Sequence, residues 1–196
     1  MYNILEIIGT IAFANSGVMI AVKKKMDILG VATLGLINAI GGGIIRDIFI
    51  GKLPPTIFIN PFCAYIAIVV SLIVFSPLIR EFVEKYNRVL LFVDAIGLGT
   101  FTVIGVHAGA NFNNLFLQVC LGVVTGTFGG VLRDICAMEK PTIFVRNFYA
   151  TASIIGAIIC SLLLNYNENL AMILGIIVTV ILRLLGSKYN WQLPKA

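Results

Sequence analysis

The chain alternates between long apolar segments and short polar breaks. The apolar segments are about 17 to 23 residues long and carry almost no charge. A hydrocarbon layer about 30 Å thick is crossed by roughly 20 residues of helix, and a helix satisfies its own backbone hydrogen bonds in lipid. The pattern therefore predicts seven transmembrane helices, over residues 4–22, 28–50, 62–79, 89–107, 115–137, 148–165 and 170–186.

Composition supports a membrane protein. The 196 residues are 59% hydrophobic and only 12% charged, and the mean hydropathy is +1.02. A water-facing domain of this size has too much surface to hide so many apolar side chains. We therefore expect an all-α integral membrane protein that forms a single membrane domain over residues 1–196, with lipid as its surroundings.

The net charge of +5 predicts orientation rather than nucleic-acid binding. Lysine and arginine gather in the loops after the first, third and fifth predicted helices and in the tail, whereas the opposite side carries only Lys52. Because basic loops stay in the cytoplasm, we expect the N-terminus outside and the C-terminus inside. The residues predicted to be cytoplasmic are Lys23, Lys24, Lys25, Arg80, Lys85, Arg88, Lys140, Arg146, Lys188 and Lys195.

The chain also contains an internal repeat. Three pairs of segments match at offsets of 88, 87 and 86 residues. A match that drifts by only two residues over most of two 75-residue stretches is far more specific than a single motif. The matching pairs are LEIIGTIAFANSGV (5–18) with VDAIGLGTFTVIGV (93–106), GGIIRDI (42–48) with GGVLRDI (129–135), and PTIFINPFCA (55–64) with PTIFVRNFYA (141–150).

The repeats should face opposite sides of the membrane. The first repeat covers residues 4–79 and the second 89–165, and each holds three predicted helices, so the second starts from the other side. The helix at 170–186 has no counterpart. Inverted repeats commonly place a ligand or ion path near the midplane, between discontinuous helices of the two halves.

Glycine clusters lie inside the second and fifth predicted helices. Each glycine costs a helix about 1 kcal/mol relative to alanine, and charge follows each cluster at once. We predict that both helices are broken at these clusters; the alternative is close helix packing through small residues. The clusters are Gly41, Gly42 and Gly43 in the first repeat, and Gly126, Gly129 and Gly130 in the second.

Each cluster is followed by an arginine and an aspartate, Arg46-Asp47 and Arg133-Asp134. A charge at membrane depth is costly and usually has a partner or a wet cavity. The alternative is that the arginines extend to the headgroups. Because both repeats carry the pair, we favour a functional role.

Glu6 and Asp94 occupy matching positions and supply candidate partners. We predict two symmetry-related ion pairs at the two ends of a central path, Glu6 with Arg46 outside and Asp94 with Arg133 inside. Further polar residues at helix depth are each expected to be structural, since Ser and Thr bond their own helix; they are Asn15, Ser16, Asn38, Thr100, Thr102, Thr125 and Thr127. His107 is expected at a solvated helix end.

The layout of three, three and one helices with GGGIIRD and GGVLRD resembles the bacterial family labelled as a glycine transporter domain, which is similar to the prokaryotic trimeric intracellular cation (TRIC) channels. The resemblance implies a homotrimer in the prokaryotic inner membrane, with a potassium-conducting pore in each protomer lined by helices 1, 2, 4 and 5. The site residues expected along that path are Glu6, Gly41, Gly42, Gly43, Arg46, Asp47, Asp94, Gly129, Gly130, Arg133 and Asp134.

Two functions follow from these observations. The first is a monovalent cation channel of modest selectivity, because the sequence lacks a potassium-filter motif such as TVGYG. The second is a secondary transporter of a small zwitterion such as glycine. We expect no enzyme and no cofactor beyond permeating potassium or sodium, since the sequence lacks HExxH, a metal-spaced Cys/His cluster and a nucleophile-base pair. A purely structural scaffold gives no reason for duplicated charges at membrane depth.

Overall fold

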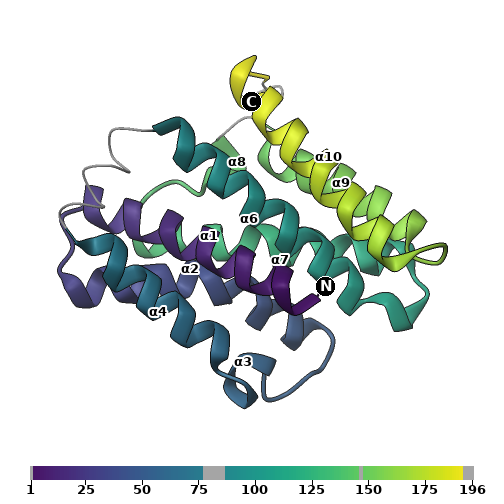
Figure 1. Ribbon diagram of the computed structural model, residues 1–196, viewed down its shortest axis with the longest axis horizontal. Coiled ribbons are helices and arrows are strands. Elements are labelled where there is room, and N and C mark those ends of the chain that lie inside the picture. The colour runs from purple at the N-terminus through teal and green to yellow at the C-terminus, as the bar shows by residue number, and fades with distance from the viewer. Residues whose placement is uncertain (1, 77–86, 146–147, 192–196) are drawn as a thin grey trace.

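The computed structural model describes residues 2–76, 87–145 and 148–191, and within these ranges the chain is helical and has no strand (Figure 1). The elements are α1 (Tyr2–Lys23), α2 (Ile28–Phe49), α3 (Thr56–Ile59), α4 (Phe62–Phe75), α6 (Asn87–Ala108), η1 (Ala110–Phe112), α7 (Leu115–Cys136), α8 (Thr142–Val145), α9 (Tyr149–Leu163) and α10 (Glu168–Lys188).

All seven predicted helices are present, and each begins within two residues of its predicted start. The third differs at its end, because α4 stops at Phe75 and Ser76 is extended. Ser76 precedes a proline in the sequence, and a residue before proline disfavours helical geometry. The predicted end at residue 79 lies outside the described residues, as do the expected cytoplasmic residues Arg80, Lys85, Arg146 and Lys195.

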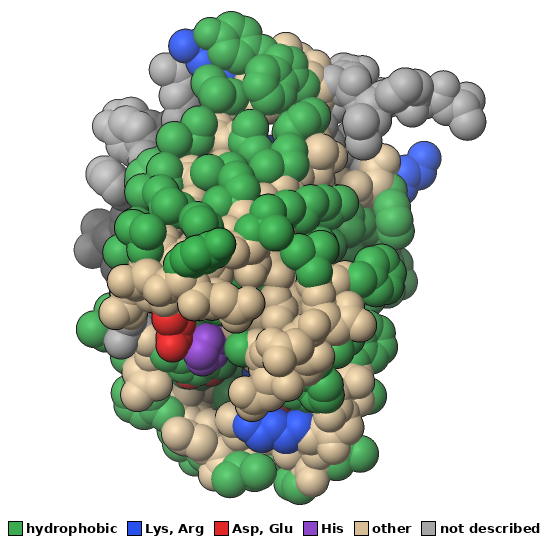
Figure 2. Space-filling model, turned by 90° about the vertical axis from the view of Figure 1, so that its right-hand side faces the viewer, with side chains coloured by type: hydrophobic (Ala, Val, Ile, Leu, Met, Phe, Trp, Pro, Cys, Tyr) green, Lys and Arg blue, Asp and Glu red, His purple; other side chains and the backbone are tan. Residues whose placement is uncertain are grey.

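Five described helices, α1, α2, α6, α7 and α10, are long and apolar enough to cross a membrane. The helices α4 and α9 are also apolar but have only 14 and 15 residues. A total of seven spans therefore stays a prediction. Figure 2 looks towards the end of the molecule that carries the histidine; apolar side chains cover much of this view, and charged side chains are few.

Three of these helices begin at a side-chain cap. Asp27 accepts a hydrogen bond from the backbone N–H of Gly30 at 2.8 Å and begins α2. Asn114 and Asn167 do the same for α7 and α10, each at 3.1 Å. An Asp or Asn side chain at this position satisfies one of the free N–H groups of the first turn, so the sequence itself sets these starts.

The helices α1 and α6 lie side by side near the middle of the molecule and run in opposite directions (Figure 1). On one side α4 packs against α1 and α2, and on the other α9 and α10 pack against α6. The helices α2 and α7 pack against each other and join the two repeats. The unpaired helix α10 therefore belongs to the side of the second repeat.

Reciprocal contacts show that a two-fold axis relates the repeats. Gly9 of α1 faces the ring of Phe101 on α6, and its counterpart Gly97 faces the ring of Phe13 on α1. The two rings meet with their centroids 5.1 Å apart. When two equivalent residues each contact the other's equivalent partner, the contact is two-fold symmetric. The repeats are thus inverted, and the Phe13 and Phe101 rings meet close to the axis.

The glycine clusters do not break the helices, so that prediction is wrong for the described chain: α2 and α7 are continuous α-helices through them. The glycines serve close packing instead. A Cβ on Gly42 would collide with the backbone oxygen of Thr125, and one on Gly129 with that of Asn38. These contacts are again reciprocal. Packing of two backbones at this distance offsets the low helix propensity of glycine, which the sequence pattern alone does not reveal.

Candidate functional site

The charged pair of each repeat lies at the end of its helix and is closed on itself. Arg46 Nε and Nη2 donate to Asp47 Oδ1 at 2.9 and 2.7 Å, and Arg133 Nε donates to Asp134 Oδ1 at 2.8 Å. The two arginines are only 7% and 4% exposed. Neither side chain extends to the surface. The alternative that these arginines reach the lipid headgroups is therefore excluded for the described structure.

In each pair the second carboxylate oxygen of the aspartate binds the segment that follows the helix. Asp47 Oδ2 accepts from the backbone N–H of Thr56 at 2.7 Å, and Asp134 Oδ2 accepts from both the N–H and the hydroxyl of Thr142 at 2.7 Å. Both threonines begin the short helices α3 and α8, which the sequence analysis missed because four residues show no periodicity. Each aspartate thus neutralises its arginine and fixes the loop behind it.

The predicted ion pairs need correction. Among the described residues no direct ion pair joins Glu6 to Arg46, because the guanidinium lies against Asp47. Asp94 and Arg133 are connected through Ser16 instead: Arg133 Nη1 donates to the hydroxyl of Ser16 at 2.7 Å, and that hydroxyl lies 3.3 Å from Asp94 Oδ1. In each repeat the aspartate that follows the arginine in the chain lies within hydrogen-bonding distance of it, so the arginine pairs with this aspartate.

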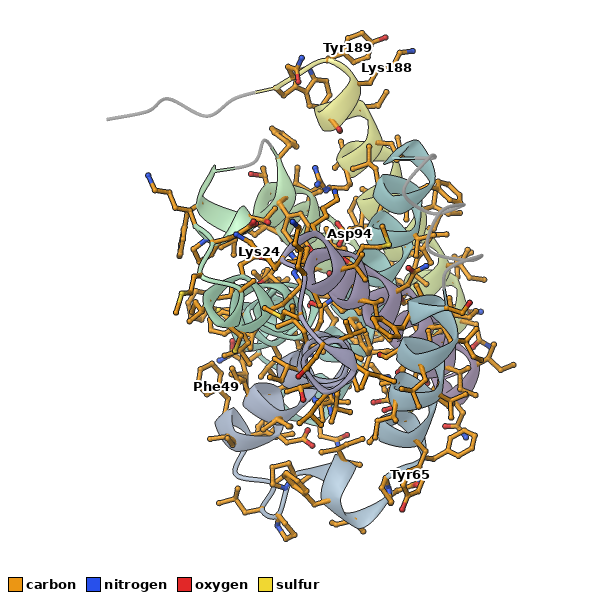
Figure 3. The ribbon with its side chains drawn as sticks, turned by 90° about the vertical axis from the view of Figure 1, so that its left-hand side faces the viewer. Lys24, Phe49, Tyr65, Asp94, Lys188 and Tyr189 are labelled. Carbon is orange, nitrogen blue, oxygen red and sulfur yellow. The ribbon has the colours of Figure 1, made fainter. Side chains whose placement is uncertain are left out.

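Two residues beside Asp94 were not singled out in the sequence, and with Asp94, Arg133 and Asp134 they form what we call the inner cluster, after its predicted position. Arg183 of α10 is 3% exposed and has a guanidinium nitrogen 4.0 Å from Asp94 Oδ2. Its guanidinium carbon lies 4.9 Å from the ring centre of Tyr149, which is also buried. Figure 3 labels Asp94 among the helices, and Lys188 and Tyr189 at the top of the view, at the end of α10. An arginine within the apolar run IIVTVILRLLG was the available signal.

The end that holds Glu6 contains a cavity of about 310 Å³. It lies between α1, α2, α3, α4 and α6, and its polar lining includes Glu6, Thr10, Arg46 and Asp47. Phe101, one of the two rings near the two-fold axis, also lines it. Two carboxylates and one guanidinium therefore face this space, which leaves an excess of negative charge.

The remaining predicted residues are glycines, and they lie in three places. Gly43 lines the cavity, whereas Gly41, Gly42 and Gly129 lie where α2 crosses α7. Gly130 faces the Arg133 guanidinium and the Tyr149 hydroxyl.

Most of the polar residues at helix depth have structural contacts, as predicted. The hydroxyls of Thr100, Thr125 and Thr127 donate to carbonyls of their own helices. Thr102 pairs with Ser153 across two helices at 2.7 Å. Ser16 differs from these, because it joins two charged groups of different repeats, and the buried Oδ1 of Asn15 has no hydrogen-bond partner among the described residues.

His107 lies at the end of α6 beside the first residue of α10. Its Nδ1 is 3.5 Å from a carboxylate oxygen of Glu168, and its ring centre is 5.5 Å from that of Tyr2. Figure 2 shows the histidine and an acidic side chain next to each other on this face. The contact links the starts of α1 and α10 to the end of α6.

A helical membrane protein built from two inverted three-helix units, with buried charges at both ends and a polar cavity at one of them, has the architecture of a transport protein: a channel or a transporter. The chain belongs to the family described as "Glycine transporter". The family model matches residues 3–77 and matches residues 91–165 a second time.

Known relatives place the chain in a membrane. It is 37% identical to the UPF0126 inner membrane protein YadS of Escherichia coli strain K12, over 97% of this chain and 93% of that protein. It is 33% identical to the UPF0126 membrane protein YvgT of Bacillus subtilis strain 168, over 98% of this chain and 95% of that protein.

Solved structures confirm the resemblance to prokaryotic TRIC channels. One TRIC cation channel has a TM-score of 0.91 and 40% identity, with 100% of this chain and 97% of that chain covered. The TRIC trimeric intracellular cation channel orthologue from Rhodobacter sphaeroides has a TM-score of 0.89 and 30% identity, with 96% and 98% covered. The protein therefore has the TRIC channel fold.

Proposed function

We propose that the protein is a monovalent cation channel, permeable to potassium, with a pore inside each protomer. The observation that carries this proposal is the cavity of about 310 Å³ at the end of the bundle that holds Glu6, lined by two carboxylates and one guanidinium. A polar space of net negative charge within the bundle attracts cations and repels anions. The family relationship to TRIC cation channels supports the same function.

In this proposal the ion path follows the two-fold arrangement. A cation enters the cavity beside Glu6, passes between the helices where Phe13 and Phe101 meet, and leaves beside Asp94. The two rings, buried and 5.1 Å apart, form a hydrophobic constriction. A constriction of this kind closes a pore by excluding water, so conduction requires the rings to move apart.

Selectivity among monovalent cations should be modest. The polar groups that line the cavity are carboxylate, hydroxyl and amide side chains rather than a rigid ring of backbone carbonyls. The guanidinium of Arg46 disfavours divalent cations, because its charge opposes theirs more strongly. We expect potassium and sodium to permeate at comparable rates.

We further propose that three copies assemble, as in the trimeric orthologue from Rhodobacter sphaeroides. The apolar surface of α4 and α9 offers area for contact between copies as well as for lipid. Each protomer carries its own charged cluster and cavity, so each copy would hold a complete path.

Transport of a small zwitterion is the second candidate. The cavity presents a carboxylate from Glu6 and a guanidinium from Arg46, which are the groups that pair with an ammonium and a carboxylate. The two candidate functions differ in the transported species. A channel passes potassium down its gradient, whereas a transporter moves glycine with saturation.

The test is a planar bilayer that contains the purified protein under a potassium chloride gradient, with and without glycine. We expect single-channel currents whose reversal potential follows potassium and does not change with glycine. A reversal potential that follows chloride would exclude the channel as proposed. Saturable glycine uptake by proteoliposomes without unitary currents would favour the transporter.

Glu6 provides the variant that tests the role of the cavity. Glu6→Gln removes the excess negative charge and keeps the shape, so potassium conductance should fall by a factor of about two to ten. The matched control is Glu168→Gln, because Glu168 is an exposed acid at the same end of the molecule and outside the cavity. Equal conductance in both variants and the unchanged protein would contradict the role of Glu6.

A further inference from the structure

The two ends of the proposed path differ in charge although the repeats match. Beside Glu6 the cavity holds two carboxylates and one guanidinium. Beside Asp94 the inner cluster holds two carboxylates, Asp94 and Asp134, and two guanidinium groups, Arg133 and Arg183. The additional positive charge comes from α10, which has no counterpart in the repeat among the long helices that the structure describes.

The position of Arg183 is fixed by the packing of α10. A Cβ on Gly99 of α6 would lie 3.2 Å from the backbone oxygen of Ile176, and one on Gly156 of α9 would lie 2.9 Å from that of Gly175. Small residues thus bring α10 against α6 and α9 at backbone distance. Arg183 extends from this helix to Asp94 Oδ2, with its guanidinium carbon 4.9 Å from the ring centre of Tyr149.

Tyr149 also breaks the symmetry. At the offset of 86 residues it corresponds to Cys63, which lines the cavity beside Glu6. In the second repeat a large aromatic ring, only 3% exposed, stands at that position, and the arginine lies over its face. A guanidinium over an aromatic face is held by the ring's charge distribution as well as by a carboxylate.

We propose that Arg183 determines the conductance and charge selectivity of the inner end of the path, by neutralising Asp94 while Tyr149 holds the guanidinium in place. This inference rests on the proposed channel function. Without the arginine, Asp94 would become the inner equivalent of Glu6, and the inner end would carry the same excess negative charge as the outer end. Cations would then be concentrated at both ends.

The variant Arg183→Gln tests this in planar bilayers under a potassium chloride gradient. Potassium conductance should rise by a factor of about two to ten, and the permeability of potassium relative to chloride should rise with it. Arg183→Lys keeps the charge and should conduct as the unchanged protein does. Lys188→Gln removes a positive charge from an exposed position on the same helix and should also change nothing.

A second variant distinguishes the effect of the removed charge on conductance from an effect on folding. Arg183→Gln combined with Asp94→Asn removes both members of the pair, restores the balance of charge and leaves no buried charge without its partner. Its conductance should fall well below that of Arg183→Gln, because the excess negative charge is gone. It also provides the measurement if Arg183→Gln alone does not fold: potassium conductance several-fold above that of the unchanged protein would overturn the proposal.

The outcomes distinguish this inference from the proposed function. If the unchanged protein conducts potassium but Arg183→Gln has the same conductance and selectivity, the role of Arg183 is wrong and the channel function stands. If the unchanged protein passes no cation current, the channel function is wrong and this inference fails with it. A rise in Arg183→Gln that the double variant reverses supports both.

Discussion

At the scale of single residues, each buried arginine of the repeats is neutralised by the residue beside it. Arg133 and Asp134 are both less than 5% exposed, and Asp134 also holds Thr142 at the start of α8. Removing one member of a buried pair leaves a charge without compensation, whereas removing both is often tolerated. The pair is therefore a structural unit as well as a part of the candidate site.

This gives a first prediction for stability. Asp134→Asn should lower the free energy of unfolding by about 3 to 5 kcal/mol, because the Arg133 guanidinium would stay buried without its direct counter-charge. The double variant Arg133→Gln with Asp134→Asn should be clearly more stable than the single one. Thermal unfolding of the purified proteins in detergent measures both. A double variant that is less stable than the single one would contradict this reading of the pair.

Ser16 gives a second prediction at this scale. Its hydroxyl accepts from Arg133 and donates to Asp94, so Ser16→Ala should cost roughly 1 to 3 kcal/mol, the range for hydrogen bonds to charged groups. Ser71→Ala is the matched control, because the Ser71 hydroxyl donates to the carbonyl of Ala67 in its own helix at 2.7 Å. Equal unfolding temperatures of the two variants would show that the Ser16 bridge contributes nothing.

At the scale of helices, glycine sets the distance between backbones. Gly42 and Gly43 are neighbours in one cluster, but only Gly42 faces the backbone of α7. A Cβ on Gly43 would meet nothing nearer than Arg46 Nη2 at 3.9 Å. A hinge would need both residues to be glycine, whereas close packing needs only the one that faces the partner helix.

The third prediction follows from this difference. Gly42→Ala should destabilise the protein by about 1 to 3 kcal/mol or prevent its folding, because α2 and α7 must separate. Gly43→Ala should be neutral or stabilising by up to about 1 kcal/mol, since alanine is the better helix former. Thermal unfolding in detergent compares the two. If both changes were equally damaging, the glycines would act as a hinge after all.

At the scale of the whole molecule, the two-fold axis places corresponding loops on opposite sides of the membrane. Leu53 and Met138 lie in the loops that follow α2 and α7, and they are 70% and 94% exposed. We propose from the distribution of basic residues that Leu53 lies outside and Met138 in the cytoplasm.

The fourth prediction tests this orientation. In a background that lacks the exposed Cys136, Leu53→Cys should react with a membrane-impermeant maleimide in intact cells. Met138→Cys should react only after the cells are permeabilised. Neither change alters the charge of a loop, so the topology signal is preserved. The opposite pattern would reverse the orientation, and labelling of both sites in intact cells would contradict an inverted repeat.

Much of the fold follows from local patterns. Apolar length predicts the helices, Asp27, Asn114 and Asn167 cap three of them, and the offset between GGIIRDI and GGVLRDI reveals the repeat. The candidate site was predicted only in part. The sequence identified four charged residues within the membrane-spanning segments: Arg46, Arg133, Glu6 and Asp94. It did not identify their partners, because a partner depends on which side chains meet in space.

The sequence by itself determined the membrane setting, the repeat and the residues whose burial needs compensation, because hydropathy and charge act through composition and spacing along the chain. Only the tertiary structure decided whether the glycines bend a helix or bring two together, and that Arg183 of an unpaired helix meets Asp94. Both depend on distances between segments far apart in the chain, which are fixed by packing rather than by any local preference.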